Sequence, residues 1–241
     1  MNKLGILAAI MLLVLALVPA VIAVNKVCEP SDVVIVIDKS GSMTTVDNGE
    51  TETRMSLAKD AAKYFVDLLA EDDKSGLVSF ASTAHLDQEL TDNGSLVKAA
   101  IDALVPSGLT CISCGIEKAQ VELEDNGREN VTPVIVMLTD GYPTMDTDEL
   151  ALAAAGYSKG EGTTIFTIGI GEADQDLLEE IASDPTKFSF GAPSDLDAIY
   201  EDIAGALCQP DDEVPEFGTV AAGVALVGAI AGFFVLRRRR D

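Results

Sequence analysis

The segment Asp38-Lys39-Ser40-Gly41-Ser42 places one carboxylate and two hydroxyls within five residues. Such oxygen atoms are hard ligands that suit Mg²⁺ or Ca²⁺. Gly41 lies between the two serines and allows a tight turn that can aim both hydroxyls at one point. The residue types and their spacing therefore predict a divalent-cation site. The alternative is that these residues serve only as helix caps and turns.

An apolar run directly precedes this segment. Residues 33–37 read Val-Val-Ile-Val-Ile, and such β-branched runs are typical of strands that are buried on both faces of a parallel sheet. In open α/β sheets, ligands bind just beyond the carboxyl ends of the strands. Asp38, Ser40 and Ser42 therefore lie where a ligand site is expected.

Strand and helix patterns alternate along the rest of the chain. Strands are predicted at 32–37, 76–81, 84–90, 131–138, 163–170 and 187–190, and helices at 54–70, 96–104, 111–124, 149–158, 174–182 and 194–207. Asn93 lies in the start signal of the second helix, and Ser194 is predicted to cap the last one. This alternation predicts a doubly wound α/β fold, in which helices cover both faces of a mostly parallel central sheet of about six strands.

The string Asp-Lys-Ser-Gly-Ser-Met at 38–43 resembles the first segment of the von Willebrand factor A (VWA) family, which carries a metal-ion-dependent adhesion site. That family pattern continues with a distant Thr and then a distant Asp, and Thr110 and Asp140 stand in these positions. The resemblance covers about residues 31–208. It implies a Rossmann-like VWA fold in which the strand at 84–90 is an antiparallel edge strand.

The resemblance also implies one bound divalent cation, usually Mg²⁺, with Ca²⁺ or Mn²⁺ as the alternatives. Ser40 and Ser42 would bind the ion directly, and Thr110 would do so directly or through water. Asp38 and Asp140 would lie at or near the ion and orient its waters. One coordination position is left for a carboxylate, so the expected partner is a protein that presents Asp or Glu.

We therefore expect a cell-surface module for adhesion or ligand recognition. The alternative is a scaffold subunit of an exported surface assembly that binds a fixed partner. An enzyme is not expected, because the sequence offers no Ser-His-Asp set and no second metal cluster. The one histidine, His85, alternates with Ala84 and Leu86 and is predicted to face solvent.

The two ends of the chain differ from its middle. Residues 1–23 combine Lys3 with an apolar stretch and indicate a secretory signal peptide, or alternatively a retained N-terminal anchor. Residues 218–236 carry no charge and would form a transmembrane helix about 28 Å long, followed by a basic cytoplasmic tail at 237–241. The domain is thus predicted at 24–208, with a Pro- and acid-rich linker at 209–217.

The C-terminal segment has a second resemblance, to the PEF-type sorting signals of archaea. Pro215-Glu216-Phe217 precedes the short apolar helix and the terminal arginines. In those systems an archaeosortase-like enzyme removes the helix, and the protein is re-anchored at the surface. An ordinary single-pass membrane anchor is the alternative. Both interpretations place the domain outside the cell, on its surface.

The middle of the chain is strongly acidic. Between residues 24 and 236 lie 11 of the 16 Lys and Arg but 39 of the 40 Asp and Glu, so this part has a net charge of −28. Such a charge disfavours binding to nucleic acids and to anionic membrane surfaces. Asn93 and Asn130 begin Asn-x-Ser/Thr sequons and are candidate glycosylation sites on an exported chain.

The four cysteines fit two disulfides, which export would permit. Cys28 and Cys208 bracket the domain, and the resemblance supports a bridge between them. Cys111 and Cys114 directly follow Thr110, and we interpret them as a local disulfide. The alternatives are a redox-active pair, for which no thioredoxin-like context is present, and half of a zinc site.

Overall fold

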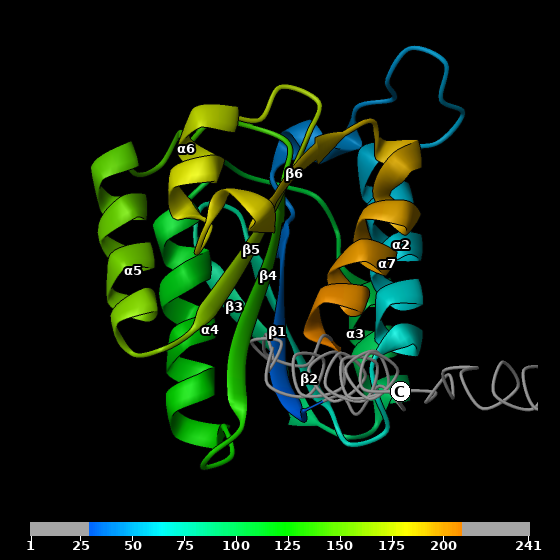
Figure 1. Cartoon of the computed structure of the whole chain (residues 1–241). Helices are drawn as coiled ribbons and strands as arrows, with labels where there is room; N and C mark the ends of the chain where they lie inside the picture. The colour runs from blue at the N-terminus through cyan, green and yellow to red at the C-terminus, as the bar shows by residue number, and fades with distance from the viewer. Residues whose placement is uncertain (1–28, 209–241) are drawn as a thin grey trace, which may run out of the picture.

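The computed structural model describes residues 29–208, which form one six-stranded sheet in the order β3-β2-β1-β4-β5-β6 (Figure 1). Only the pair β2 and β3 is antiparallel, so β3 is the antiparallel edge strand that the sequence analysis predicted. The strands are β1 (Ser31–Asp38), β2 (Lys74–Phe80), β3 (Ala84–Thr91), β4 (Thr132–Thr139), β5 (Thr164–Ile170) and β6 (Phe188–Gly191).

Six α-helices of the described part cover the two faces of this sheet. One layer contains α2 (Arg54–Leu68), α3 (Gly94–Ala103) and α7 (Leu196–Leu207), and the other contains α4 (Ile112–Asn126), α5 (Asp148–Gly160) and α6 (Gln175–Ile181). Figure 1 shows the two layers on opposite sides of the central strands. The predicted doubly wound α/β fold is confirmed.

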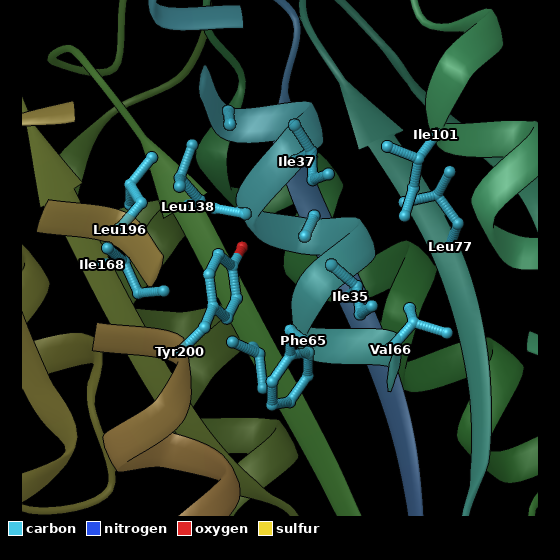
Figure 2. Close-up of a cluster of buried hydrophobic side chains, with 14 of the residues drawn as sticks. Ile35, Ile37, Phe65, Val66, Leu77, Ile101, Leu138, Ile168, Leu196 and Tyr200 are labelled. Atoms are coloured by element: carbon cyan, nitrogen blue, oxygen red, sulfur yellow. The ribbon is translucent and has the colours of Figure 1, made fainter. Parts of the chain in front are cut away.

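The core consists of two apolar clusters, one on each face of the sheet. Along β1, Val33, Ile35 and Ile37 pack into the first cluster and Val34 and Val36 into the second, because successive side chains of a strand point to opposite faces. All of them are fully buried, as the β-branched run predicted. Figure 2 shows Ile35 and Ile37 beneath α2, with Leu196 and Tyr200 of α7 beside them.

Strand β1 also defines the topological switch point of the sheet. The chain leaves β1 through α2 and enters β2 on one side of it, whereas β4 pairs with β1 on the other side. In doubly wound sheets, ligands bind in the crevice at the carboxyl ends of the two strands that flank such a point. Here that crevice lies beyond Asp38 and Thr139.

One predicted helix start is wrong. Ser194 does not cap α7, because Pro193–Asp195 form a separate 3₁₀ turn and the helix begins at Leu196. Pro193 fixes the backbone of this turn, which closes when the Asp195 amide donates to the Ala192 carbonyl at 2.9 Å. The Asp195 carboxylate in turn accepts a hydrogen bond from the Ala192 amide at 3.0 Å. By contrast, Asn93 caps α3, since its side chain accepts from the Ser95 amide.

Several predictions concern residues outside 29–208. The signal peptide at 1–23, the linker at 209–217, the transmembrane helix at 218–236, the tail at 237–241 and the Cys28–Cys208 bridge all involve such residues. Within the described part, no helix is both long and apolar enough to cross a bilayer.

Candidate metal centre

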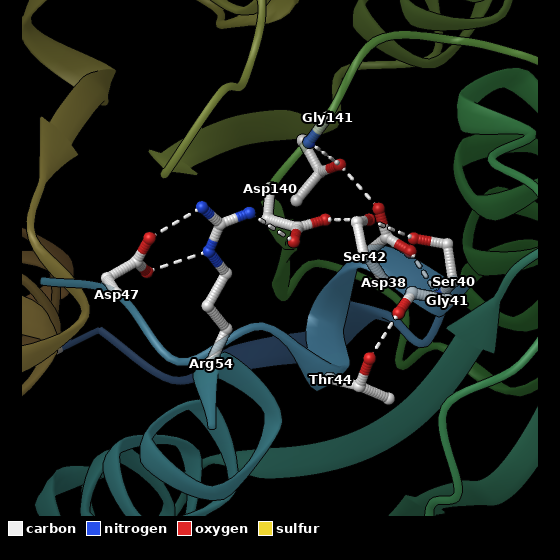
Figure 3. A network of polar contacts seen from close by, with 10 residues as sticks. Asp38, Ser40, Gly41, Ser42, Thr44, Asp47, Arg54, Asp140 and Gly141 are labelled. Atoms are coloured by element: carbon white, nitrogen blue, oxygen red, sulfur yellow. Dashed lines mark hydrogen bonds and ion pairs between the residues drawn. The ribbon is translucent and has the colours of Figure 1, made fainter. Parts of the chain in front are cut away.

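The ends of β1 and β4 bring two of the predicted site residues together. Asp38 is the last residue of β1, and Asp140 directly follows β4. The two strands are parallel neighbours, with Ile37 of β1 in register with Leu138 of β4. Residues 102 positions apart in the sequence therefore lie side by side at the carboxyl edge of the sheet (Figure 3).

Asp38 is fully buried, and both of its carboxylate oxygens accept hydrogen bonds. Oδ1 accepts from the Ser40 amide at 2.7 Å, and Oδ2 accepts from the Thr139 hydroxyl at 2.6 Å. Burial nevertheless raises the pKa of Asp38 to about 6, and the charge of nearby Asp140 adds to this rise. The hydrogen bonds lower the pKa and offset part of the effect of burial. A positive charge near Asp38 would favour its ionised form.

Three further oxygen-bearing side chains form a continuous chain of contacts. The hydroxyls of Ser40 and Ser42 lie 3.0 Å apart, and the Ser42 hydroxyl donates to Asp140 Oδ1 at 2.7 Å. Ser40 and Asp140 are buried, whereas Ser42 is exposed. The cluster is therefore buried at Ser40 and Asp140 and open to solvent at Ser42.

The loop that carries Thr110 reaches this cluster through its backbone. The Gly41 amide donates to the Gly108 carbonyl at 3.0 Å, which ties the loop to the turn between the two serines. Thr110 itself is buried, and its amide donates to the Thr144 hydroxyl at 2.9 Å. Its carbonyl accepts from the amides of Thr144 and Met145. Hydrogen bonds thus fix the Thr110 loop both to the turn at Ser40–Ser42 and to the loop after β4.

Two features stabilise the helix that follows Thr110. Cys111 and Cys114 form a disulfide in the first turn of α4. Asp146, from the loop after β4, accepts hydrogen bonds from the amides of Ile112 and Ser113 at 3.2 and 2.7 Å. A carboxylate at a helix N-terminus also interacts favourably with the helix dipole. The sequence analysis did not identify this role of Asp146, because the two segments are more than 30 residues apart.

The donor set fits a hard divalent cation. Asp38, Ser40, Ser42 and Asp140 present carboxylate and hydroxyl oxygens within one hydrogen-bonded cluster, and Mg²⁺, Ca²⁺ and Mn²⁺ favour such donors. Residues 29–208 contain no group of three or more His, Cys, Asp or Glu side chains that could hold a metal. An ion in this centre would therefore depend on hydroxyl ligands in addition to the carboxylates, and the cluster offers those of Ser40 and Ser42.

Arg54 is a member of the centre that the sequence analysis missed. Its Nη1 donates to Asp140 Oδ2 at 2.8 Å, while Nε and Nη2 donate to the two oxygens of Asp47, each at 2.7 Å (Figure 3). These hydrogen bonds raise the pKa of Arg54 above its ordinary value, and the bond to Asp47 has the largest effect. In turn, the hydrogen bond from Arg54 lowers the pKa of Asp47. One signal was available: Arg54 opens a helix, where the dipole disfavours a cation.

The remaining candidate residues lie away from this centre. His85 is exposed on the edge strand β3, and its Nε2 lies 3.3 Å from the Thr83 hydroxyl. Asn93 and Asn130, which begin the two sequons, are both exposed. Their glycosylation stays a prediction.

Known proteins resemble a large part of this chain. A UPF0353 protein of Nocardia farcinica is 35% identical in an alignment of 151 residues that covers 58% of this chain and 44% of that protein. Matrilin-3 of Mus musculus is 26% identical in an alignment of 200 residues that covers 76% of this chain and 40% of that protein. The chain spans less than half the length of these two relatives.

One solved structure has a similar fold, and its site motif contains a metal. Proximal thread matrix protein 1 from the mussel byssus, described with a zinc-occupied metal-ion-dependent adhesion site motif, is 28% identical with a TM-score of 0.64. The similarity covers 75% of this chain and 46% of that one. The profile of the von Willebrand factor type A domain matches residues 32–202, so this chain belongs to that family.

Proposed function

We propose that this domain binds a protein ligand through a divalent cation and performs no catalysis. One observation carries the proposal: Asp38, Ser40, Ser42 and Asp140 form a single hydrogen-bonded cluster at the switch point of the sheet. Mg²⁺ is the expected ion, with Ca²⁺ or Mn²⁺ as the alternatives, because every donor is an oxygen.

The roles of the residues follow from their burial and contacts. Ser40 and Ser42 would contact the ion through their hydroxyls, and Thr110 would contact it directly or through a bound water. Asp38 and Asp140 would orient the waters of the ion and balance its charge. The exposed side of the cluster, at Ser42, leaves room for one more oxygen ligand. A carboxylate of an Asp or Glu side chain in a partner protein suits this position.

The surface around the cluster also favours a protein partner. The three loops that carry the site residues each present large apolar side chains to solvent, which are Val46, Val105, Leu109, Tyr142 and Met145. Exposed apolar side chains close to one another often mark interaction surfaces. Together with a cation they would contact a carboxylate that is flanked by apolar groups.

The relatives support a binding role without defining the ligand. The mussel protein, whose site motif is occupied by zinc, is a thread matrix protein, and Matrilin-3 is among the curated relatives. A similar site in this chain would hold a cation with the same type of donors.

We also propose that the domain is displayed on the cell surface. This part of the proposal rests on sequence alone: a signal peptide at 1–23, an apolar segment at 218–236 and the arginines at 237–240. The C-terminal segment would act either as a membrane anchor or as a PEF-type signal that an archaeosortase-like enzyme cleaves. A bridge between Cys28 and Cys208 would join the two ends of the domain.

Titration calorimetry with MgCl₂ and MnCl₂ tests the metal site. Ser42→Ala removes an exposed hydroxyl of the cluster, and we expect it to weaken cation binding at least tenfold. Thr44→Ala is the matched control, since Thr44 is exposed in the same turn and its hydroxyl donates to the Gly41 carbonyl rather than to a side chain of the cluster. Equal binding by Ser42→Ala and the parent protein would contradict the proposal.

A pull-down from surface extracts tests the ligand. We expect the partner of the parent protein to be lost with EDTA, recovered with Mg²⁺ and absent with Ser42→Ala. A partner that is retained equally in EDTA and by Ser42→Ala would instead indicate a scaffold subunit that binds a fixed partner without the ion.

A further inference from the structure

The Arg54 side chain occupies a fixed position between two carboxylates at the rim of the metal centre. It holds Asp47 with two hydrogen bonds and Asp140 with one, and only 7% of its side chain is exposed. The Asp140 side chain is fully buried, whereas that of Asp47 is 26% exposed. A buried cation therefore lies directly against one of the two acids that would serve the bound ion.

The fold makes room for this cation. Gly171, which follows β5, has a φ of 60°, and a Cβ atom at this position would lie 2.3 Å from Arg54 Cζ. The guanidinium therefore packs against backbone that only a glycine leaves open. At the other end of the side chain, the Arg54 amide donates to the Thr45 carbonyl at 2.9 Å. Segments that follow β1, β4 and β5 thus meet around Arg54.

This contact determines how Asp140 faces the centre. Asp140 Oδ2 accepts from Arg54, and Oδ1 accepts from the Ser42 hydroxyl. Only one oxygen is therefore directed to the hydroxyl cluster, and the charge of the carboxylate is shared with a permanent cation. An ion bound here would be less strongly neutralised than by a free carboxylate, and it would attract an external anion more strongly.

We propose that Arg54 is a positioning residue that weakens binding of the resident cation and leaves that cation more attractive to an anionic ligand. The inference rests on the proposed function, since it concerns the same centre. Asp47 reduces this effect of Arg54 on the bound ion. It lies on the side of the guanidinium away from Asp140, and its negative charge offsets part of the positive charge.

The two partners of this ion pair are therefore expected to have opposite effects. Arg54→Gln removes a positive charge beside Asp140, and we expect Mg²⁺ to bind about tenfold more tightly. Asp47→Asn removes the opposing negative charge, and we expect Mg²⁺ to bind several-fold more weakly. Arg54→Lys retains the charge and should stay within about threefold of the parent protein. A purely structural ion pair would give weaker binding in both variants.

Titration calorimetry with MgCl₂ alone measures these affinities in the full domain, and urea unfolding in EDTA reports the stability of each variant. Arg128→Gln is the control for loss of an arginine–carboxylate pair, because Arg128 contacts Asp32 at the start of β1, at the opposite edge of the sheet. It should lower stability and leave Mg²⁺ affinity unchanged.

Unchanged or weaker Mg²⁺ binding by Arg54→Gln would overturn the inference, as would a shift of both variants in the same direction. These outcomes differ from failure of the proposed function. If neither the parent protein nor Arg54→Gln binds Mg²⁺, Mn²⁺ or Ca²⁺, the metal site itself is refuted and the role of Arg54 with it.

Discussion

Thr139→Val tests whether Asp38 is an ionised, buried carboxylate that depends on one hydroxyl. Thr139 and Asp38 are both fully buried, and the Thr139 hydroxyl donates to Asp38 Oδ2 at 2.6 Å. Valine has nearly the same shape as threonine but cannot donate. The substitution therefore leaves Oδ2 without this donor and keeps the packing at the end of β4.

The expected magnitude depends on the charge of Asp38. A hydrogen bond to a charged group contributes about 1.5–3 kcal/mol to stability, whereas a bond between neutral groups contributes about 1 kcal/mol. Burial raises the pKa of Asp38 from 3.8 to about 6, so the carboxyl is mostly protonated in the folded domain at pH 5 and ionised at pH 8. We expect Thr139→Val to lower the free energy of unfolding by about 2 kcal/mol at pH 8 and by about 1 kcal/mol at pH 5.

The sign of the underlying pH dependence follows from the raised pKa. Because the folded domain holds the proton of Asp38 more tightly than the unfolded chain, ionised Asp38 opposes folding, and its cost grows as the pH rises from 3.8 through about 6. At higher pH this cost is complete, at about 3 kcal/mol. The Thr139 hydrogen bond lowers the cost, so its removal should matter most above pH 6.

Urea unfolding in EDTA at pH 5 and pH 8 measures both values. Thr167→Val is the matched control: Thr167 is also fully buried, but its hydroxyl donates to a neutral acceptor, the Leu178 carbonyl, at 2.8 Å. We expect it to cost about 1 kcal/mol at both pH values. The reasoning is refuted if the cost of Thr139→Val is the same at pH 5 and pH 8, or if it equals that of Thr167→Val at pH 8.

Two other substitutions probe the packing around the centre and in the core. Gly171→Ala should lower the free energy of unfolding, measured in urea, by at least about 2 kcal/mol, since it adds a clash with Arg54 to the strain of a positive φ. Gly162→Ala is the control, because Gly162 has a φ of 88° but no atom lies within 4 Å of the added Cβ. It should cost about 1 kcal/mol. An equal loss in both would exclude the clash. Tyr200→Phe should leave the free energy of unfolding unchanged or raise it by up to about 1 kcal/mol, because the buried Tyr200 hydroxyl has no hydrogen-bond partner within residues 29–208. The substitution keeps the ring, whose centroid lies 5.0 Å from that of Phe65 (Figure 2). A loss above 1 kcal/mol would show that the hydroxyl does form a bond.

Much of the fold could be predicted because its signals are local. The β-branched run at 33–37 predicted a strand buried on both faces, and spacing of apolar residues at three and four positions predicted α2. Strand ends could be located from the sequence, so Asp38 and Asp140 could be assigned to the carboxyl edge. The start of α7 could not be located, because the 3₁₀ turn at Pro193–Asp195 includes Ser194, the predicted cap, and delays the helix to Leu196.

The family pattern also predicted Thr110 as a site residue. However, the loop that carries Thr110 is fixed by backbone hydrogen bonds, which a pattern of side chains cannot predict. The amide of Gly41 and the carbonyl of Gly108 meet only because two loops converge at the same edge of the sheet. Likewise, the sequence does not show that Asp146 caps α4, because Asp146 and the start of that helix are more than 30 residues apart.

The sequence by itself determined the alternation of strands and helices and the set of oxygen donors, since both depend on residue type and short spacing. Only the tertiary structure decided that Arg54 lies against Asp140, 86 residues away, and that Thr139 supports Asp38 across 101 residues. The physical reason is that a charge or hydroxyl acts on whatever lies within a few ångströms, and the order of strands in the sheet sets those neighbours. The donors of the centre are therefore visible in the sequence, whereas their charge balance is a property of the fold.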